Sequence, residues 1–311
     1  MGRLTAEGLL AIEWTLIGIA FCLILARLNL RVSYRRSGFV LSDAFIVVAF
    51  AAGLSLNAVD VRLHRRGIYD PSIDFRMTTW VAPEEETVDV YRTLYIMYLP
   101  FYMEQYCNKG TLVALYYEIF GHGSRKIRIS LALIVFYCVA GFVTTMSVIL
   151  FHCKWGCYWS YTDACPIRCW QVSDNLGWAF HFTSEIFIFV LPLVCISRLN
   201  MSKAQKISAS VTFAVGLVNI AITVARWFVV QAVFTPVPPL NTGEAMAVAD
   251  GHIGLIVSIL PSLRPYLRIW QKSAESWRIK AGSSKDGTLL ASPAVSTERT
   301  CSSKAEGSDH A

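Results

Sequence analysis

Seven apolar runs, each about 20 residues long, constrain the fold of this 311-residue chain more than any other feature. They cover roughly residues 9–28, 39–59, 93–120, 129–152, 175–197, 207–231 and 246–270. A helix of that length spans the hydrocarbon core of a bilayer, where only helices and closed barrels satisfy their backbone hydrogen bonds. The short alternating segments of a membrane barrel do not occur. The runs therefore predict an all-α membrane protein, with a seven-helix bundle over residues 1–280.

The composition excludes a soluble domain. Hydrophobic residues make up 54% of the chain and charged residues only 16%, whereas a soluble protein carries about 25% charged residues. The net charge is +6, but the positive residues lie between the apolar runs, which favours a membrane role over nucleic-acid binding. We therefore expect a multi-pass protein whose partner is the lipid bilayer, and no nucleic acid.

Lysine and arginine residues in the short loops predict the orientation of the bundle. The loops after the first, third and fifth runs are basic and contain no acidic residue, and a further basic group follows the seventh run. Arg62, Arg65 and Arg66 after the second run are discordant, although acidic residues accompany them. The pattern predicts an outer amino terminus and a cytoplasmic carboxyl terminus, with the plasma membrane as the expected location. Residues 281–311 are rich in Ser, Thr, Gly and Ala and predict a disordered cytoplasmic tail.

Ionisable side chains inside the runs are the candidate functional residues, because each costs at least about 2.5–3.5 kcal/mol at bilayer depth without a partner or water. The candidate intramembrane polar or ligand site consists of Glu104, Gln105, Lys109, Glu185, Arg226 and Asp250. Helix rise places Arg226 and Asp250 at similar depth near the outer ends of neighbouring helices, which predicts an ion pair. Lys109 can reach toward Glu185. Glu13 and Asp43 lie near the membrane faces, where water can solvate them.

These residues have two interpretations. Polar contacts can simply hold membrane helices together, or they can line a pathway for a ligand or protons. An excess of acids over bases favours carboxyls that are protonated or face a wet cavity. Pro100, Pro192 and Pro261 fall within the runs and predict helix kinks, since proline removes a backbone donor.

Four of the nine cysteines, Cys153, Cys157, Cys165 and Cys169, lie in one outer loop with C-x3-C-x7-C-x3-C spacing. An oxidising exterior favours disulfides. Four cysteines allow three connectivities, and the sequence does not choose among them. A zinc site is the alternative, but the usual C-x2-C spacing and histidine ligands are missing, so no metal is expected. The loop's aromatic residues form either an interface belt or a lid over a cavity.

Known catalytic motifs are absent. The chain contains no HExxH, CxxC, G-x-S-x-G or glycine-rich phosphate loop, so we expect no enzyme activity. A retinal pigment needs a lysine in the seventh helix, and residues 246–270 contain none. We therefore expect no retinal and no other cofactor.

Several segments, in order, are similar to one known group. They are the lysine-led third-run segment KGTLVALYYEIF (109–120), the outer-loop segment FHCKWGCYW (151–159), SEIFIFVLP (184–192) with Glu185, Arg226, and LPSLRP (260–265). On these residues the chain resembles fungal rhodopsin-domain integral membrane proteins, including Pth-type receptor-like and satratoxin-cluster-type proteins. It departs from them in having Glu185 where Asp is expected, a reduced acidic pair at Ser42-Asp43, and the extra Cys157 and Cys165.

The resemblance implies seven helices, no known catalysis, and a role as a receptor or as a membrane component of a secondary-metabolite (mycotoxin) cluster. Asp-Arg-Tyr after the third run and Asn-Pro-x-x-Tyr in the seventh are absent, so the sequence gives no support for G-protein coupling. We expect a receptor or sensor with an unknown small-molecule ligand. The alternative is a proton-coupled carrier that uses the acid excess.

Overall fold

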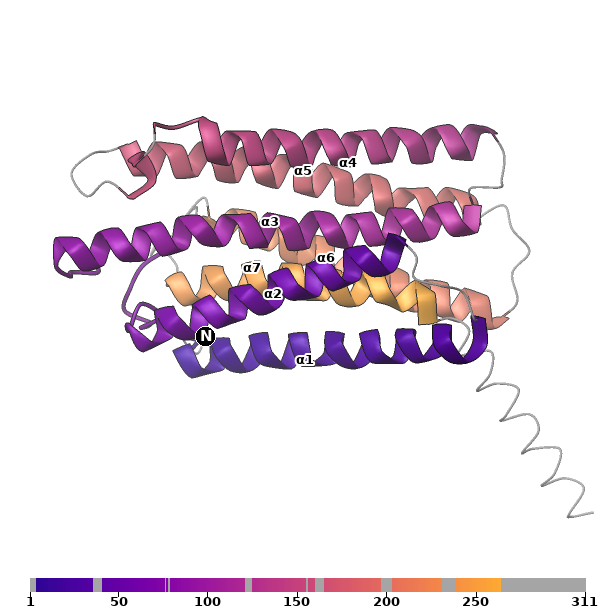
Figure 1. Cartoon of the computed structure of the whole chain (residues 1–311), viewed down its shortest axis with the longest axis horizontal. Coiled ribbons are helices and arrows are strands. Elements are labelled where there is room, and N and C mark those ends of the chain that lie inside the picture. Colours follow the sequence, from indigo (N-terminus) through magenta and orange to yellow (C-terminus); the bar gives the residue numbers. More distant parts are fainter. Residues whose placement is uncertain are drawn as a thin grey trace, which may run out of the picture. The chain divides into compact units, whose positions relative to one another are not determined.

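A computed structural model of the chain shows seven long helices and no strand in its described part (Figure 1). The structure describes residues 4–35, 41–75, 77, 79–120, 125–154, 156–159, 165–196, 203–230 and 239–263, and at some helix ends it describes the backbone only. The helices are α1 (Ala6–Leu30), α2 (Leu41–Arg65), α3 (Glu84–Phe120), α4 (Arg125–Phe151), α5 (Cys165–Ile196), α6 (Lys203–Val230) and α7 (Leu240–Ile259). The predicted all-α seven-helix fold is confirmed.

Several helices begin earlier than the apolar runs. α3 starts at Glu84, and Glu84, Glu85 and Glu86 form its first turn, where acidic side chains interact favourably with the helix dipole. α7 starts at Leu240, directly after Pro239. The polar ends of these helices therefore lie outside the hydropathy signal although their backbone is helical.

The end of the seventh helix differs from the expected one. α7 ends at Ile259 and continues as the 3-10 turn η3 (Leu260–Leu263). Pro261 lies in that turn, where its missing N–H cannot continue the α-helical hydrogen bonds. Residues 264–280 and the predicted tail 281–311 lie outside the described residues.

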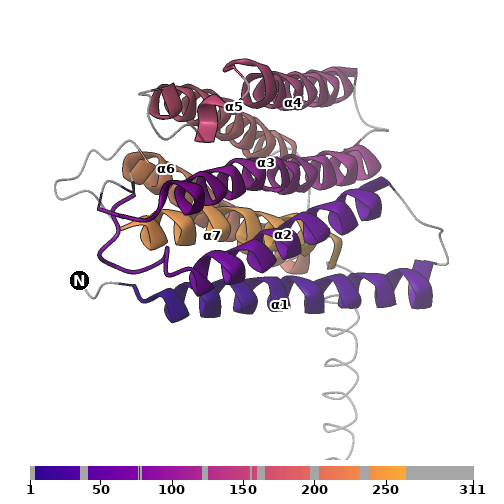
Figure 2. The ribbon, with the colours of Figure 1, turned by 60° about the vertical axis from the view of Figure 1, so that its left-hand side comes forward.

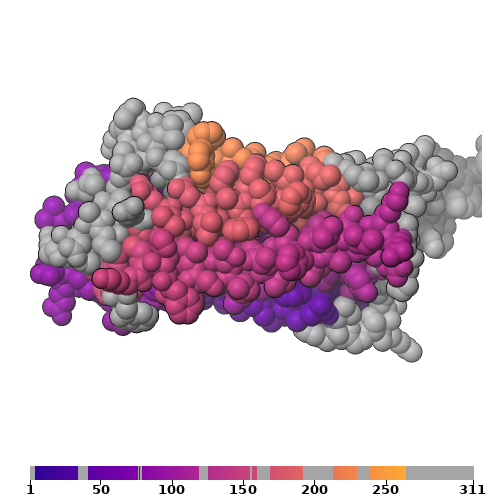
Figure 3. All heavy atoms as spheres, turned by 90° about the horizontal axis from the view of Figure 1, so that it is seen from above, coloured from indigo at the N-terminus to yellow at the C-terminus, as the bar shows by residue number. Residues whose placement is uncertain are grey.

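The side chains that face outward are those of a membrane protein. By length and composition, four of the described helical segments can cross a membrane, Ala6–Ser33, Leu41–Arg65, Arg125–Phe151 and Leu240–Leu263, and Phe213–Val229 is a shorter apolar helix. α4 presents large apolar side chains outward, and Phe136 is 71% exposed. Figure 3 views the side of the bundle that α4 and α5 form. In a chain with several membrane-length apolar helices, such surface is typical of side chains that face lipid.

α3 occupies the centre of the bundle. It packs against α2, α4, α5 and α7, while α7 also packs against α1 and α6 (Figures 1 and 2). Glu104, Gln105, Asn108, Lys109 and Thr111 of α3 are buried. The polar middle of α3 is therefore directed into the protein, where other helices can satisfy it.

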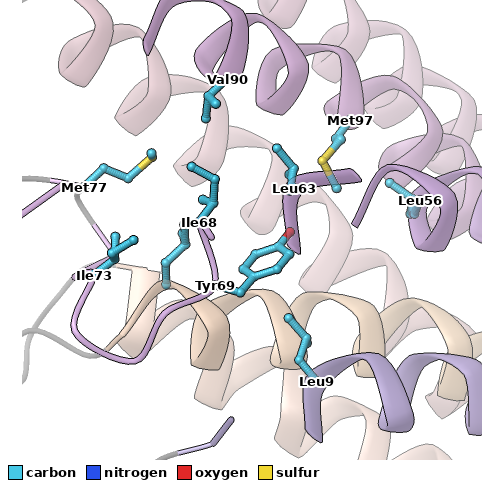
Figure 4. Close-up of a cluster of buried hydrophobic side chains, with 10 residues drawn as sticks. Leu9, Leu56, Leu63, Ile68, Tyr69, Ile73, Met77, Val90 and Met97 are labelled. Carbon is cyan, nitrogen blue, oxygen red and sulfur yellow. The ribbon is translucent and has the colours of Figure 1, made fainter. Parts of the chain in front are cut away.

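The loop between α2 and α3 packs onto the bundle (Figure 4). Ile68, Tyr69 and Ile73 of this loop join Leu9 of α1 and Leu63 of α2 in one buried apolar cluster. The backbone N–H of Leu240 donates to the carbonyl of Ile73 at 3.0 Å, which ties the loop to the first turn of α7.

The discordant basic group at the end of α2 has an acidic partner. Arg62 and Arg66 form ion pairs with Asp89 near the start of α3, at 3.3 and 2.5 Å. Since these pairs are at least partly exposed, they contribute little stability. They do supply the arginines with a counter-charge at this end of the bundle.

Candidate ligand site and buried polar network

Lys109 lies at the centre of the buried polar residues. Its Nζ donates to His181 Nδ1 of α5 at 2.6 Å and lies 3.8 Å from Glu185 Oε1. Because Nδ1 accepts this bond, the other ring nitrogen of a neutral His181 carries the proton. That nitrogen, Nε2, lies 3.3 Å from both Asp250 Oδ2 and Glu185 Oε1. His181 therefore bridges Lys109 to both carboxylates.

Asp250 of α7 joins three other helices. Arg226 Nε of α6 lies 3.6 Å from its Oδ2, and Gln105 Nε2 of α3 donates to the same oxygen at 3.3 Å. Thr223 of α6 donates to Oδ1 at 2.5 Å. The structure thus brings Arg226 and Asp250 together, as the depth argument expected, and it adds His181 and Thr223 to them.

Glu185 is also held from α6. Asn219 Nδ2 donates to Oε1 at 3.0 Å, and the Thr223 hydroxyl lies 3.2 Å from Oε2. We call Lys109, His181, Glu185, Arg226 and Asp250 the central network. Two basic and two acidic side chains, with a histidine between them, make its formal charge zero. A balanced group of this kind is far cheaper to bury than an unpaired charge.

Glu104 belongs to a second group. His252 of α7 places Nδ1 2.8 Å from Glu104 Oε1 and Nε2 2.9 Å from Asn57 Oδ1 of α2. Asn108 donates to the carbonyl of Gly251 at 2.9 Å. A Cβ at Gly251 would lie 2.8 Å from Glu104 Oε2, so glycine at this position lets α7 approach the carboxyl of α3.

Three further carboxyls, two of them buried and one half-buried, lie toward the outer end as the predicted orientation defines it. Glu13 of α1 and Asp60 of α2 are fully buried, and each interacts electrostatically with Glu244 of α7. We call Glu13, Asp60 and Glu244 the outer acidic triad. The Tyr69 hydroxyl donates to Asp60 Oδ1 at 2.5 Å. Burial, and then the nearby carboxylates, raise the pKa of Tyr69 well above its ordinary value.

A cavity of about 260 Å³ lies beside the triad. Aromatic and aliphatic side chains form most of its wall, including Phe75 and Met77 of the α2–α3 loop, Tyr98 and Phe101 of α3, and Trp170 of α5. Its ionisable residues are Asp174, Arg226 and Glu244. The Tyr98 hydroxyl donates to Asp174 at 2.6 Å, and the Arg226 guanidinium lies 5.1 Å from the centre of the Phe101 ring.

The cysteine loop covers the neighbouring part of the bundle. Cys153 and Cys169 form a disulfide, which confirms that this loop is cross-linked. Cys157 Sγ lies 3.1 Å from Cys169 Sγ, and the side chain of Cys165 lies outside the described residues. Tyr158, in the short helix η2 (Cys157–Trp159), stacks on Tyr95 and bonds to Ser173 at 2.9 Å. Burial raises the pKa of Tyr158.

Two of the three prolines that were predicted to lie within helices do so. Pro100 falls inside α3 and Pro192 inside α5, although the side chain of Pro192 lies outside the described residues. Gln105 and Glu104 are neighbours in sequence yet serve different groups, since Gln105 contacts Asp250 and Glu104 contacts His252.

The expectation that Glu13 and Asp43 are solvated is wrong. Glu13 is fully buried, with no hydrogen-bond partner on either oxygen. Asp43 is 3% exposed and pairs with Arg27 at 2.9 Å and Arg31 at 2.8 Å. Arg27 lies in the last turn of α1, and Arg31 directly follows that helix, so the inner end of the bundle has its own ion-pair group.

Sequence reasoning also missed His181, His252, Asn57, Asp60 and Glu244. A histidine in the middle of an apolar run was the available signal for His181, because the polar ring must find partners there. Asp60 and Glu244 fell one or two residues outside the expected runs. Because the hydropathy signal ends before these positions, the sequence analysis left out Asp60, which is buried, and Glu244, which lies in the cavity wall.

Three ligand-type atoms of His181, Glu185 and Asp250 lie within 4.8 Å of one another, an arrangement that can hold a metal ion. The Lys109 ammonium already contacts His181 and lies close to Glu185. A second cation at this place would have to overcome the positive charge of Lys109. The geometry therefore favours Lys109 itself as the cation of the central network.

In a comparison with known protein families, the model of the fungal rhodopsin domain matches residues 26–269. The chain belongs to this family. The match spans the helices that carry the central network, the cavity wall and the disulfide loop, and it confirms the family expected from the sequence segments. Searches of curated proteins and of solved structures gave no significant match.

Proposed function

We propose that this fungal rhodopsin-domain protein is a receptor or sensor of the plasma membrane that binds a small amphipathic molecule in the outer cavity. The cavity carries the proposal. About 260 Å³ of space is enclosed mainly by apolar and aromatic side chains, with a few ionisable groups. Small-molecule sites in proteins have this make-up, because apolar walls supply affinity and a few polar groups fix orientation.

Arg226 supports a signalling role because it belongs both to the cavity wall and to the central network. A ligand that contacts or displaces its guanidinium also changes the Arg226–Asp250 ion pair. Asp250 in turn contacts Gln105 of α3 and His181 of α5. Occupation of the cavity therefore has a physical route to four helices.

The family resemblance suggests one ligand class. A product or intermediate of a secondary-metabolite pathway is a small amphipathic molecule of the kind that this cavity suits, so the protein would serve the pathway as its membrane sensor. We propose binding without catalysis and without retinal, since no lysine lies between Leu240 and Leu263.

A ligand screen on the protein in lipid nanodiscs tests the proposal. Compounds that raise the unfolding temperature of the wild type should lose this effect in Ala247→Trp, which fills the cavity. Ala132→Trp is the matched control, because Ala132 is exposed on α4 and lies outside the cavity wall. Trp170 lies in the wall, so binding should also change a fluorescence component that Trp170→Phe removes. Equal responses from all four proteins would contradict the proposal.

A proton-coupled carrier is the second candidate, and the Asp60–Asn57–His252–Glu104 series favours it. Asn57 and Asp60 are one helical turn apart on α2, and His252 links Asn57 to Glu104. Such a row of titratable and polar groups from the outer end to the centre can pass protons. Proteoliposomes with an internal pH dye test it. Proton uptake driven by an added solute should occur with wild type and disappear in Glu104→Gln.

A further inference from the structure

The described acids and bases of the bundle do not balance evenly along its length. At the inner end Asp43 pairs with Arg27 and Arg31. Nearer the outer end, Lys109 lies close to Glu185, and Arg226 lies close to Asp250. These four basic residues, of which Arg27, Lys109 and Arg226 are buried, all lie close to a carboxylate. Three carboxyls near the outer end, those of Glu13, Asp60 and Glu244, are in none of these pairs.

The outer acidic triad lies at that end. No described basic side chain forms an ion pair with Glu13, Asp60 or Glu244; the distances that qualify as ion pairs all involve other acids. Neither oxygen of Glu13 and only one of Asp60 has a hydrogen-bond partner in the described structure. Unpartnered carboxylates in such surroundings are costly, and a nearby positive charge offsets that cost.

Glu244 connects the triad to the cavity, because it contributes to the cavity wall while Glu13 and Asp60 interact with it electrostatically. Asp174 adds a second carboxyl to the wall, and Arg226 is its one basic residue within the described structure. Arg226 pairs with Asp250 and also interacts electrostatically with Glu244 and Asp174. One arginine thus faces three carboxyls, so acidic groups outnumber basic groups around the cavity.

The rest of the wall suits an aromatic cation. Tyr91, Tyr98, Phe101 and Trp170 supply ring faces and edges around the space. Phe101 already accepts the Arg226 guanidinium over its ring, which shows that these rings can receive a positive group. Aromatic side chains attract organic ammonium groups by the same interaction.

We propose that the cavity takes a small aromatic amine, whose ammonium group is received by Glu244 with Glu13 and Asp60 behind it and whose ring packs among the aromatic side chains. This inference rests on the proposed function and names its ligand class. Asp174 is the second carboxyl within the cavity wall, so it sets a weaker alternative position for the ammonium.

Tryptamine and tryptophol are a suitable probe pair, because they share the indole ring and differ in having an amine or a hydroxyl. Binding is measured by isothermal titration calorimetry on the full chain in nanodiscs of zwitterionic lipid, with empty nanodiscs subtracted. Tryptamine should bind at least tenfold more tightly than tryptophol. Glu244→Gln should remove most of this difference by weakening the binding of tryptamine far more than that of tryptophol.

Glu13→Gln tests the carboxyl behind Glu244, and it should weaken tryptamine binding about three- to tenfold. Glu7→Gln is its matched control, because Glu7 lies on the same helix and is exposed. Each variant is first shown to unfold at the wild-type temperature or above it, so that lost binding reflects the site.

The outcomes separate this inference from the proposed function. If both probes bind equally and Ala247→Trp abolishes both, the cavity is a ligand site but the cation inference is wrong, as it would be if the carboxyls were neutral. If neither probe binds, or if Ala247→Trp leaves both unchanged, the inference is overturned and the proposed function must be judged by its own ligand screen.

Discussion

The central network and the outer acidic triad contain the same kind of side chain in opposite electrostatic settings. In the network, Asp250 and Glu185 have Lys109 and Arg226 within 4 Å. In the triad, no described basic residue forms an ion pair with Glu13, and both of its oxygens lack hydrogen bonds. Counter-charge, rather than burial, therefore distinguishes them. Carboxylates that are paired with cations hold helices together, whereas carboxyls outside such pairs are available to a ligand.

Removal of Lys109 should have the largest effect on stability. Lys109→Met removes the ammonium from the half-buried Glu185 and leaves Arg226 to pair with the buried Asp250. Breaking a buried pair from one side costs about 3–5 kcal/mol in soluble proteins, so we expect a loss of about 3 kcal/mol. Reversible unfolding in mixed micelles measures it, with the exposed Lys126→Met as control. Equal stability of the two variants would show that the network is no more structural than the surface.

Loss of the disulfide should destabilise the outer side by a similar amount. Cys153 and Cys169 are 16 residues apart, and closing a loop of this size constrains the unfolded chain by about 3 kcal/mol. The Cys153→Ser/Cys169→Ser double variant should unfold earlier than wild type under non-reducing conditions. Cys22→Ser, at a free and exposed cysteine, should leave the midpoint unchanged. An equal fall of the unfolding midpoint in Cys22→Ser would show that the effect comes from replacing any cysteine and not from losing the disulfide.

The variant Gly251→Ala tests how closely α7 packs against α3 at the centre of the bundle. Its Cβ would press on the Glu104 carboxyl, and overpacking of this kind costs about 1–3 kcal/mol. Gly18→Ala is the matched control because nothing lies within 4 Å of the added atom, and alanine is the better helix former by about 1 kcal/mol. The two variants should therefore shift the thermal midpoint in opposite directions, and a shift in the same direction would contradict this packing.

Glu13→Gln tests the other half of the comparison. Replacing an unpartnered carboxyl by an uncharged amide of similar shape should leave stability unchanged or raise it by about 1 kcal/mol, because no described ion pair is lost. Unfolding of Glu13→Gln and Glu7→Gln, measured side by side, checks this. A loss of 2 kcal/mol or more in Glu13→Gln alone would reveal a cationic partner and break the distinction between the two regions.

Tyr69 should give the smallest effect, visible only in alkali. Burial first, and then the charge of Asp60, raise its pKa above the ordinary value of 10.0. A raised pKa in the folded state means that its contribution to stability is complete below about pH 10 and declines as the pH rises further. Spectrophotometric titration at alkaline pH should show one fewer late-ionising phenol in Tyr69→Phe. Loss of a phenol that ionises near pH 10, in place of a late one, would put Tyr69 in contact with water.

The seven helices and the Arg226–Asp250 pair could be predicted, because the first follow from the length of each apolar run and the second from the position of each charge along its run. Hydropathy gives each span, and helix rise gives the depth of each charge. The triad could not be predicted, because Asp60 and Glu244 mark the points where the hydropathy signal falls although the helices continue. His181 was missed because a neutral imidazole adds no charge to the count, and its position between Lys109 and Asp250 depends on how α3, α5 and α7 pack.

The attachment of the α2–α3 loop has a practical consequence. Leu240 bonds to Ile73, and the Phe75 ring occupies the space that a side chain at Gly243 would need. In the predicted orientation this segment faces the exterior. A nanobody that binds the α2–α3 loop would therefore also restrain the first turn of α7, without entering the bilayer. Such a nanobody could hold the helices of the bundle in one arrangement from outside the cell.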